Sequence, residues 1–294
     1  IDWDAEAAEK AGCEHFMMKE IHEQPKAVRD TLNSVLKDGQ IDLSEIGLTD
    51  EDIQNTEQIY IIACGSAYHV GMAAQYVFED MALGIVNVVG SSIAREAENV
   101  FYTLAGPEIS VATTKAYSSQ LIATYTLAIQ FAKVRGTVTE EQYTTYIEEI
   151  ASLPDKIQRI IDDKERIQWF ASKQANAKDV FFIGRGIDYA ICMEGSLKMK
   201  EISYIHSEAY AAGELKHGTI SLIEEGTLVI GVLTQPALYE KTVSNMVECR
   251  SRGAYLMGLT TFGNYNIEDT ADFTVYIPKT NPYFATSLAV IPLQ

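Results

Sequence analysis

The sequence is poor in basic residues and cysteines, and it contains no long apolar run. It has 23 Lys and Arg against 41 Asp and Glu, a net charge of −18 over 294 residues. Such a charge repels polyphosphate backbones at long range, so we expect no nucleic-acid partner. No apolar run approaches the roughly 20 residues needed to cross a bilayer, and the first residues lack the basic and apolar regions of a signal peptide. These absences favour a cytoplasmic protein that does not bind membranes.

The cysteines and glycines also lack the spacings typical of common cofactor sites. Cys13, Cys64, Cys192 and Cys249 form no C-x-x-C pair, so neither a zinc cluster nor a disulfide framework is predicted. Buried free thiols are the expected state. The chain has no G-x-G-x-x-G or Walker pattern, which disfavours dinucleotide and ATP binding. We therefore expect no metal and no cofactor.

Repeated strand–glycine–helix patterns indicate the fold class. The apolar run 59–64 leads into Gly65 and a helical pattern to about Met81, and the same order returns at 180–183, Gly186 and about 189–205. Each is typical of a buried parallel strand in a βα unit. Further strands are predicted at 227–234, 255–261 and 273–277. The length fits two domains, so we expect an α/β fold with two tandem doubly wound parallel sheets.

The first 50 residues are predicted to be a linker and a helical segment. Pro25 can occupy the first turn of a helix, whose apolar face then contains Val28, Leu32, Val35 and Leu36. Two histidines, His15 and His22, lie among Glu14, Glu20 and Glu23. We interpret that stretch as a solvated helix face rather than a metal site.

The two copies of the repeat are unequal in length. We expect a first domain at 51–139, a charged helical connector at 140–176, broken at Pro154, and a second domain at 177–294. Gly65 and Gln120 in the first copy correspond to Gly186 and Gln294 in the second. The first two residues are 55 positions apart, whereas the second two are 108 positions apart. The first copy is thus 53 residues shorter, which is enough for a strand, a helix and a strand. We place that missing interior segment near 84–85, and we expect a C-terminal tail to be missing from the second copy.

The stretch 189–221 has the densest set of candidate catalytic side chains. Glu194, Lys198 and Glu201 are spaced i, i+4 and i+7, which places them on one helix face. Such a stripe alone is most often a solvated surface. The rest of the helix is apolar, however, which favours a buried helix whose charged stripe faces a polar cleft or a partner. Lys198 between two carboxylates would keep Glu201 ionised, as a general base requires.

A histidine and two loops complete the candidate site. His217 lies in a glycine-flanked loop that suits acid–base chemistry, although a lone histidine is more often structural. The turn 65–67 offers backbone N–H groups and the Ser66 hydroxyl at a helix start, a ready site for phosphate. The hydroxyl-rich stretch 110–115 also precedes a helix. Together these loops predict a sugar phosphate held by hydroxyls and amides.

Three motifs resemble one enzyme family. They are ACGSAY at 63–68, GPEISVATTKAYSSQL at 106–121 and KEISYIHSEAYAAGELKHG at 200–218. All three are similar to the isomerase halves of bacterial glucosamine-6-phosphate synthases, the glutamine–fructose-6-phosphate aminotransferases. The likeness extends from about His15 to Gln294. It implies two sugar-isomerase (SIS) domains that convert fructose 6-phosphate and ammonia to glucosamine 6-phosphate in amino-sugar biosynthesis. The implied partners are an N-terminal glutaminase domain and a second copy in a homodimer with a shared active site.

The resemblance also implies roles for individual residues. Glu201 matches the base that moves a proton between C1 and C2. His217 matches a histidine that assists ring opening and comes from the neighbouring subunit. Glu194 and Lys198 match a further carboxylate and lysine of the active site. The substrate-binding loops correspond to Gly65, Ser66, Ala67, Val111, Ala112 and Thr113.

The chain departs from the family pattern in three places. The family reads C-G-T-S where 64–67 is C-G-S-A, which removes a hydroxyl at Ala67, whereas Thr113 replaces a serine and keeps one. The family's phosphate loop, S-Q-S-G-E-T, is absent and would be expected near 84–85. The tail that carries a catalytic lysine in the family is also absent.

Three alternative hypotheses remain at this point. One is a non-catalytic phosphosugar-binding SIS regulator, which would have no use for Glu201 and His217 as a proton-transfer pair. Another is a SIS deglycase or isomerase that acts on a different sugar phosphate. The third is that the polypeptide is real as it stands and inactive, but removing a strand–helix–strand segment from a parallel sheet would expose apolar surface and is expected to prevent folding.

Overall fold

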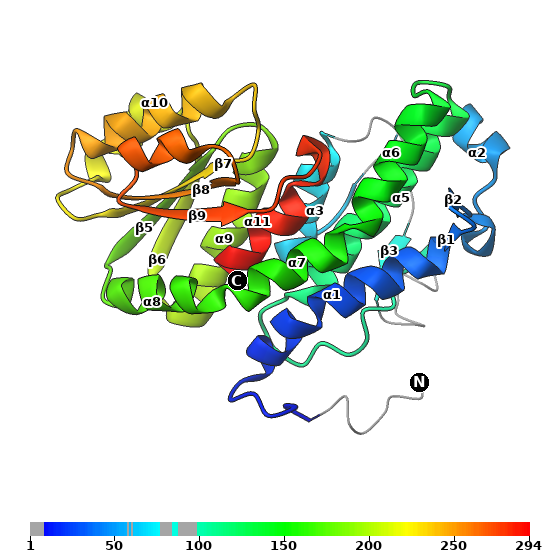
Figure 1. The fold of residues 1–294 in the computed structure, drawn as a ribbon, viewed down its shortest axis with the longest axis horizontal. Helices are drawn as coiled ribbons and strands as arrows, with labels where there is room; N and C mark the ends of the chain where they lie inside the picture. The colour runs from blue at the N-terminus through cyan, green and yellow to red at the C-terminus, as the bar shows by residue number, and fades with distance from the viewer. Residues whose placement is uncertain (1–8, 58, 60, 77–83, 88–98) are drawn as a thin grey trace. The chain divides into compact units, whose positions relative to one another are not determined.

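The computed structural model describes residues 9–57, 59, 61–76, 84–87 and 99–294 (Figure 1). The chain divides into two compact units, Ile1–Gln158 and Arg159–Gln294. The boundary falls within helix α7 (Leu153–Asp162). Each unit is described by itself.

The first unit is organised around helix α5, which contacts α1, α3 and α6. Most of α5 is buried, as expected for a helix whose apolar residues lie on all sides. Strands β3 and β4 form a parallel pair in which Ile85 lies opposite Phe101. The elements are α1 (Phe16–Val35), β1 (Leu36–Lys37), β2 (Gln40–Ile41), the 3-10 helix η2 (Ser44–Ile46), α2 (Asp50–Asn55), α3 (Gly65–Ala74), β3 (Gly84–Val86), β4 (Val100–Tyr102), α5 (Lys115–Val134) and α6 (Glu140–Ala151).

The strand predicted at 59–64 is wrong for the part of this stretch that the structure describes. Residues 61–64 form no strand and are exposed, and the Ile62 side chain is 94% exposed. An apolar run becomes a buried strand only where neighbouring strands hydrogen-bond to it. In the described part of the first unit the parallel strands β3 and β4 pair with each other. The helix predicted from about Tyr68 ends at Ala74 as α3, and 77–81 lie outside the described residues.

Helix α1 starts earlier than its sequence predicts. Pro25 lies inside the helix, nine residues after Phe16, so its expected place in the first turn is wrong. Val28, Leu32 and Val35 are buried as predicted, whereas Leu36 already belongs to β1. Proline normally weakens a helix interior because it removes one hydrogen bond. Here the turns before Pro25 are retained because their polar side chains bind the loop that leads into α5.

The second unit is a doubly wound parallel sheet, as predicted. Its strand order is β6-β5-β7-β8-β9 and every pair is parallel. Helix α10 covers one face, and α9 and α11 cover the other (Figure 1). The elements are α8 (Lys164–Gln174), β5 (Asp179–Gly184), α9 (Ile187–Ser203), β6 (His206–Ala211), η3 (Leu215–His217), η4 (Thr219–Leu222), β7 (Leu228–Leu233), α10 (Tyr239–Arg250), β8 (Tyr255–Thr261), η5 (Tyr265–Asp269), β9 (Phe273–Ile277), η6 (Pro282–Phe284) and α11 (Thr286–Leu293).

The remaining strand predictions for this unit are confirmed, and one strand was missed. β5, β7, β8 and β9 lie where the apolar runs predicted them. Edge strand β6 was not predicted, because its residues are largely polar and it is identified only by its ladder with β5. The charged stretch 140–176 is helical and is interrupted at Ser152, beside Pro154. The last helix of this stretch, α8, belongs to the second unit and packs against β9, where the ring centroids of Phe170 and Phe273 are 4.4 Å apart.

The four cysteines are free, but only two are buried. Burial raises the pKa of the Cys249 thiol to about 12 and also raises that of Cys192, so both are inert. Cys13 is partly exposed and Cys64 is exposed, so the expectation of burial is wrong for these two. For Cys64 the cause is the missing strand, because this residue ends the uncovered stretch 61–64.

Candidate functional site

The charged stripe predicted on one helix forms a buried ion-pair cluster on α9. Lys198 Nζ lies 2.5 Å from Glu201 Oε2 and 3.4 Å from Glu194 Oε1. The side chains of Glu194 and Lys198 are 0% and 2% exposed, whereas that of Glu201 is 30% exposed. The interpretation as a solvated face is therefore wrong. Glu201 is the member of this cluster that solvent, and hence a substrate, can reach.

This cluster is costly for folding. Desolvating ions in a protein interior costs several kcal/mol per ion, and one ammonium offsets two carboxylates only in part. An apolar side chain at these positions would fill the space without that cost. Buried charged groups that lower stability and include a partly exposed member are candidates for catalysis. The placement supports a proton-transfer role for Glu201, with Lys198 holding its carboxylate.

His217 lies on a different element from the cluster on α9. It ends the short helix η3, which is anchored by buried Leu215, and its own side chain is exposed. An exposed histidine can reach a site on another molecule, which is the arrangement that the family resemblance implies.

The first predicted substrate loop forms the start of α3. Gly65 has φ +58°, a conformation that favours glycine, and among the described residues no side chain caps this helix start. Ser66 is buried. Ala67 lines an apolar cavity of about 150 Å³ together with Val70 and Leu127. The backbone amides of this turn suit an anion, whereas the Ala67 side chain contributes nothing polar.

The second predicted substrate loop precedes α5 and is open at its centre. Val111 is 95% exposed, Ala112 is buried and Thr113 is partly buried. The Glu108 Oε1 atom accepts hydrogen bonds from the backbone N–H groups of Thr114 and Ala116, at 2.7 and 3.2 Å. Burial raises the pKa of Glu108, and these two bonds oppose that shift. Two of the amides at the start of α5, those of Thr114 and Ala116, are therefore already occupied.

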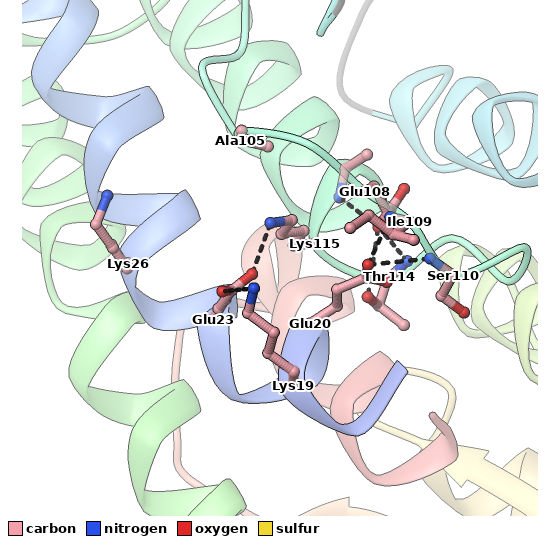
Figure 2. A network of polar contacts seen from close by, with 12 residues as sticks. Lys19, Glu20, Glu23, Lys26, Ala105, Glu108, Ile109, Ser110, Thr114 and Lys115 are labelled. Carbon is pink, nitrogen blue, oxygen red and sulfur yellow. Dashed lines mark hydrogen bonds and ion pairs between the residues drawn. The ribbon is translucent and has the colours of Figure 1, made fainter. Parts of the chain in front are cut away.

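Carboxylates of α1 bind the same loop and the start of α5 (Figure 2). Glu20 Oε1 accepts hydrogen bonds from the backbone N–H groups of Ile109 and Ser110, at 2.6 and 3.0 Å. Glu23 pairs with Lys115 at 2.6 Å and with Lys19 at 3.3 Å. The expected solvated face is therefore wrong for Glu20, which is buried.

A sequence signal for this network was available. Glu20 and Gln24 lie on the helical stripe that continues through Ala27, Thr31 and Val35, all of which are buried. Extending the apolar face backward through Pro25 would have placed both polar side chains toward the core.

The described residues show neither a metal cluster nor a membrane helix. No group of three or more His, Cys, Asp or Glu side chains in the described ranges could hold a metal ion. Within the same ranges, every helix is too short or too polar to span a bilayer.

Comparison with known proteins identifies the family. The SIS domain model matches residues 79–130 and 174–294, more than half of the chain. The chain therefore belongs to the SIS-domain family. Its structure is similar to the C-terminal domain of glucosamine-fructose-6-phosphate aminotransferase from Francisella tularensis, with a TM-score of 0.90 and 30% identity over 97% of this chain and 95% of that one.

Two curated relatives, both named glutamine–fructose-6-phosphate aminotransferase [isomerizing], cover this chain completely. The protein from Caldanaerobacter subterraneus is 47% identical and that from Clostridium tetani 44% identical. The chain spans 57% of the length of each. Both alignments extend over 346 positions, 52 more than the 294 residues of the chain. That excess is close to the 53-residue difference between the two copies of the repeat.

Proposed function

We propose that this chain carries the isomerase chemistry of a glutamine–fructose-6-phosphate aminotransferase. The substrates are fructose 6-phosphate and ammonia, and the product is glucosamine 6-phosphate. The observation that carries the proposal is the buried cluster on α9, in which Lys198 Nζ lies 2.5 Å from Oε2 of the partly exposed Glu201 side chain. The names of the 44–47% identical relatives support the substrate. A module that only binds sugar phosphates needs no such cluster.

The proton transfer assigns a role to each polar group. Ammonia adds to the C2 carbonyl of the open-chain sugar and water leaves, which forms an imine. Glu201 takes a proton from C1 and the imine nitrogen is protonated, giving an enaminol. Glu201 returns the proton to C2 as the C1 hydroxyl loses its own, so that C1 becomes the aldehyde. Lys198 holds the Glu201 side chain in place for the first step, and Glu194 pairs with the same lysine.

The other parts of the proposal concern binding and assembly. Gly65, Ser66 and Ala67 and the stretch 111–113 hold the sugar phosphate. His217 assists ring opening in the active site of a second copy, within a homodimer. Ammonia comes from a glutaminase domain of the same enzyme, which works in the cytoplasm. The domains are those expected from the repeat, at 51–139 and 177–294, joined by 140–176.

Aldose phosphate formation tests this function. Purified protein is incubated with fructose 6-phosphate, with and without ammonium, and glucose 6-phosphate and glucosamine 6-phosphate are quantified. We expect Glu201→Gln to lower kcat by about a hundredfold or more. The control is Glu240→Gln on the exposed start of α10. Unchanged turnover in Glu201→Gln, or binding without any turnover in the unaltered protein, would refute the proposal.

A further inference from the structure

Glu20 is a deeply buried carboxylate that the proposed chemistry does not use. Its side chain extends from α1 to the loop before α5 (Figure 2). Oε1 accepts two backbone N–H groups, those of Ile109 and Ser110. The residue is 2% exposed, and its Oε2 is buried with no hydrogen-bond partner among the described residues. An unsatisfied buried carboxylate oxygen costs stability, so packing alone does not explain this residue.

Carboxylates hold the loop by hydrogen bonds at both of its ends. Glu20 holds its entry at Ile109 and Ser110, and Glu108 holds its exit at Thr114. Between these points lies 111–113, where the Val111 side chain is almost fully exposed. A segment that must place backbone amides around a ligand loses conformational entropy on binding unless it is ordered beforehand. The two carboxylates supply that order.

We propose that Glu20 is a positioning residue that orders 109–113 for sugar-phosphate binding. The inference rests on the proposed function, because it takes 111–113 as part of the binding site. Glu20 touches the loop backbone and not the substrate, so its effect falls on affinity. Its loss should raise the KM for fructose 6-phosphate and leave kcat nearly unchanged.

Three variants of α1 test the proposal. Glu20→Leu removes both accepted hydrogen bonds, and we expect it to raise KM by about tenfold or more, the effect of losing charge-assisted bonds to two partly buried amides. Glu20→Gln keeps a carbonyl oxygen that can accept both amides, so it should restore most of the affinity. Glu23→Gln is the matched control, because Glu23 contacts Lys19 and Lys115 but no amide of the loop.

Amide hydrogen exchange of the full chain provides a second measurement that needs no turnover. In Glu20→Leu the amides of Ile109 and Ser110 should exchange about tenfold faster or more. Those of Thr114 and Ala116, which Glu108 holds, should keep their rates. Unaltered exchange at Ile109 and Ser110 would overturn the positioning role.

The kinetic outcomes separate this inference from the proposed function. Equal increases in KM for Glu20→Leu and Glu23→Gln would indicate a general loosening of α1 and would overturn the inference. A fall in kcat with constant KM would do the same. If the unaltered protein neither binds nor converts fructose 6-phosphate, the proposed function fails, whereas the exchange result still decides whether Glu20 orders the loop.

Discussion

Asp188 offers a sharp test of electrostatics in the second unit. It lies in the first turn of α9, is buried, and accepts hydrogen bonds from the backbone N–H and hydroxyl groups of Thr234. Burial raises the pKa of this carboxyl to about 7, against the bonds from Thr234 and the Gln235 backbone, which lower it. The unfolded chain should titrate near the ordinary value of 3.8.

The sign of the effect follows from proton binding. Between about pH 4 and 7 the folded state holds a proton on Asp188 that the unfolded state has lost, so the free energy of unfolding falls as pH rises. The slope is about 1.4 kcal/mol per pH unit within that window. From pH 5 to pH 7 the loss amounts to about 2 kcal/mol, because ionisation in the folded state limits it near pH 7. Above pH 7 the effect levels off.

Urea denaturation of Asp188→Asn at several pH values measures how much Asp188 contributes to the pH dependence of the free energy of unfolding. The neutral amide resembles the protonated acid, so the variant should lack the slope and gain about 2 kcal/mol relative to the unaltered protein between pH 5 and 7. The control is Asp269→Asn, an exposed position on η5. Parallel stability curves for the unaltered protein and Asp188→Asn would refute the reasoning, because they would mean that Asp188 titrates normally when folded.

Three further variants test the fold by urea denaturation. Lys198→Met removes the cation beside Glu194 and should lower the free energy of unfolding by about 3–5 kcal/mol. The control Lys26→Met, at an exposed ion pair, should lower it by less than about 1 kcal/mol. Equal losses in the two variants would contradict the prediction. Gly184→Ala places a Cβ 2.7 Å from the Asp188 carbonyl carbon and should cost about 1–3 kcal/mol; full stability would show that the backbone can move aside. Thr139→Ala removes the capping box of α6 and should lower the free energy of unfolding by about 1 kcal/mol. Unchanged stability would contradict a contribution from the cap.

The local patterns in the sequence predicted much of the second unit. β5, β7, β8 and β9 are apolar runs, and such runs report burial on both faces of a parallel sheet. The stripe of Glu194, Lys198 and Glu201 follows from helical geometry, which depends only on spacing. Edge strand β6 was missed because a polar edge strand has no distinctive pattern, and its hydrogen bonds to β5 identify it.

The sequence by itself determined which residues share a helix face and which runs form the second sheet. The tertiary structure decided which of those faces are buried. Packing covers Glu194 and Lys198 on α9. Glu20 is buried by contacts with a loop whose residues Ile109 and Ser110 lie 89 and 90 residues away along the chain. The apolar run before Gly65 is exposed at 61–64, where none of the strands that the structure describes pairs with it. Spacing along the chain sets the direction of a side chain, but burial depends on contacts between distant segments, which spacing does not encode.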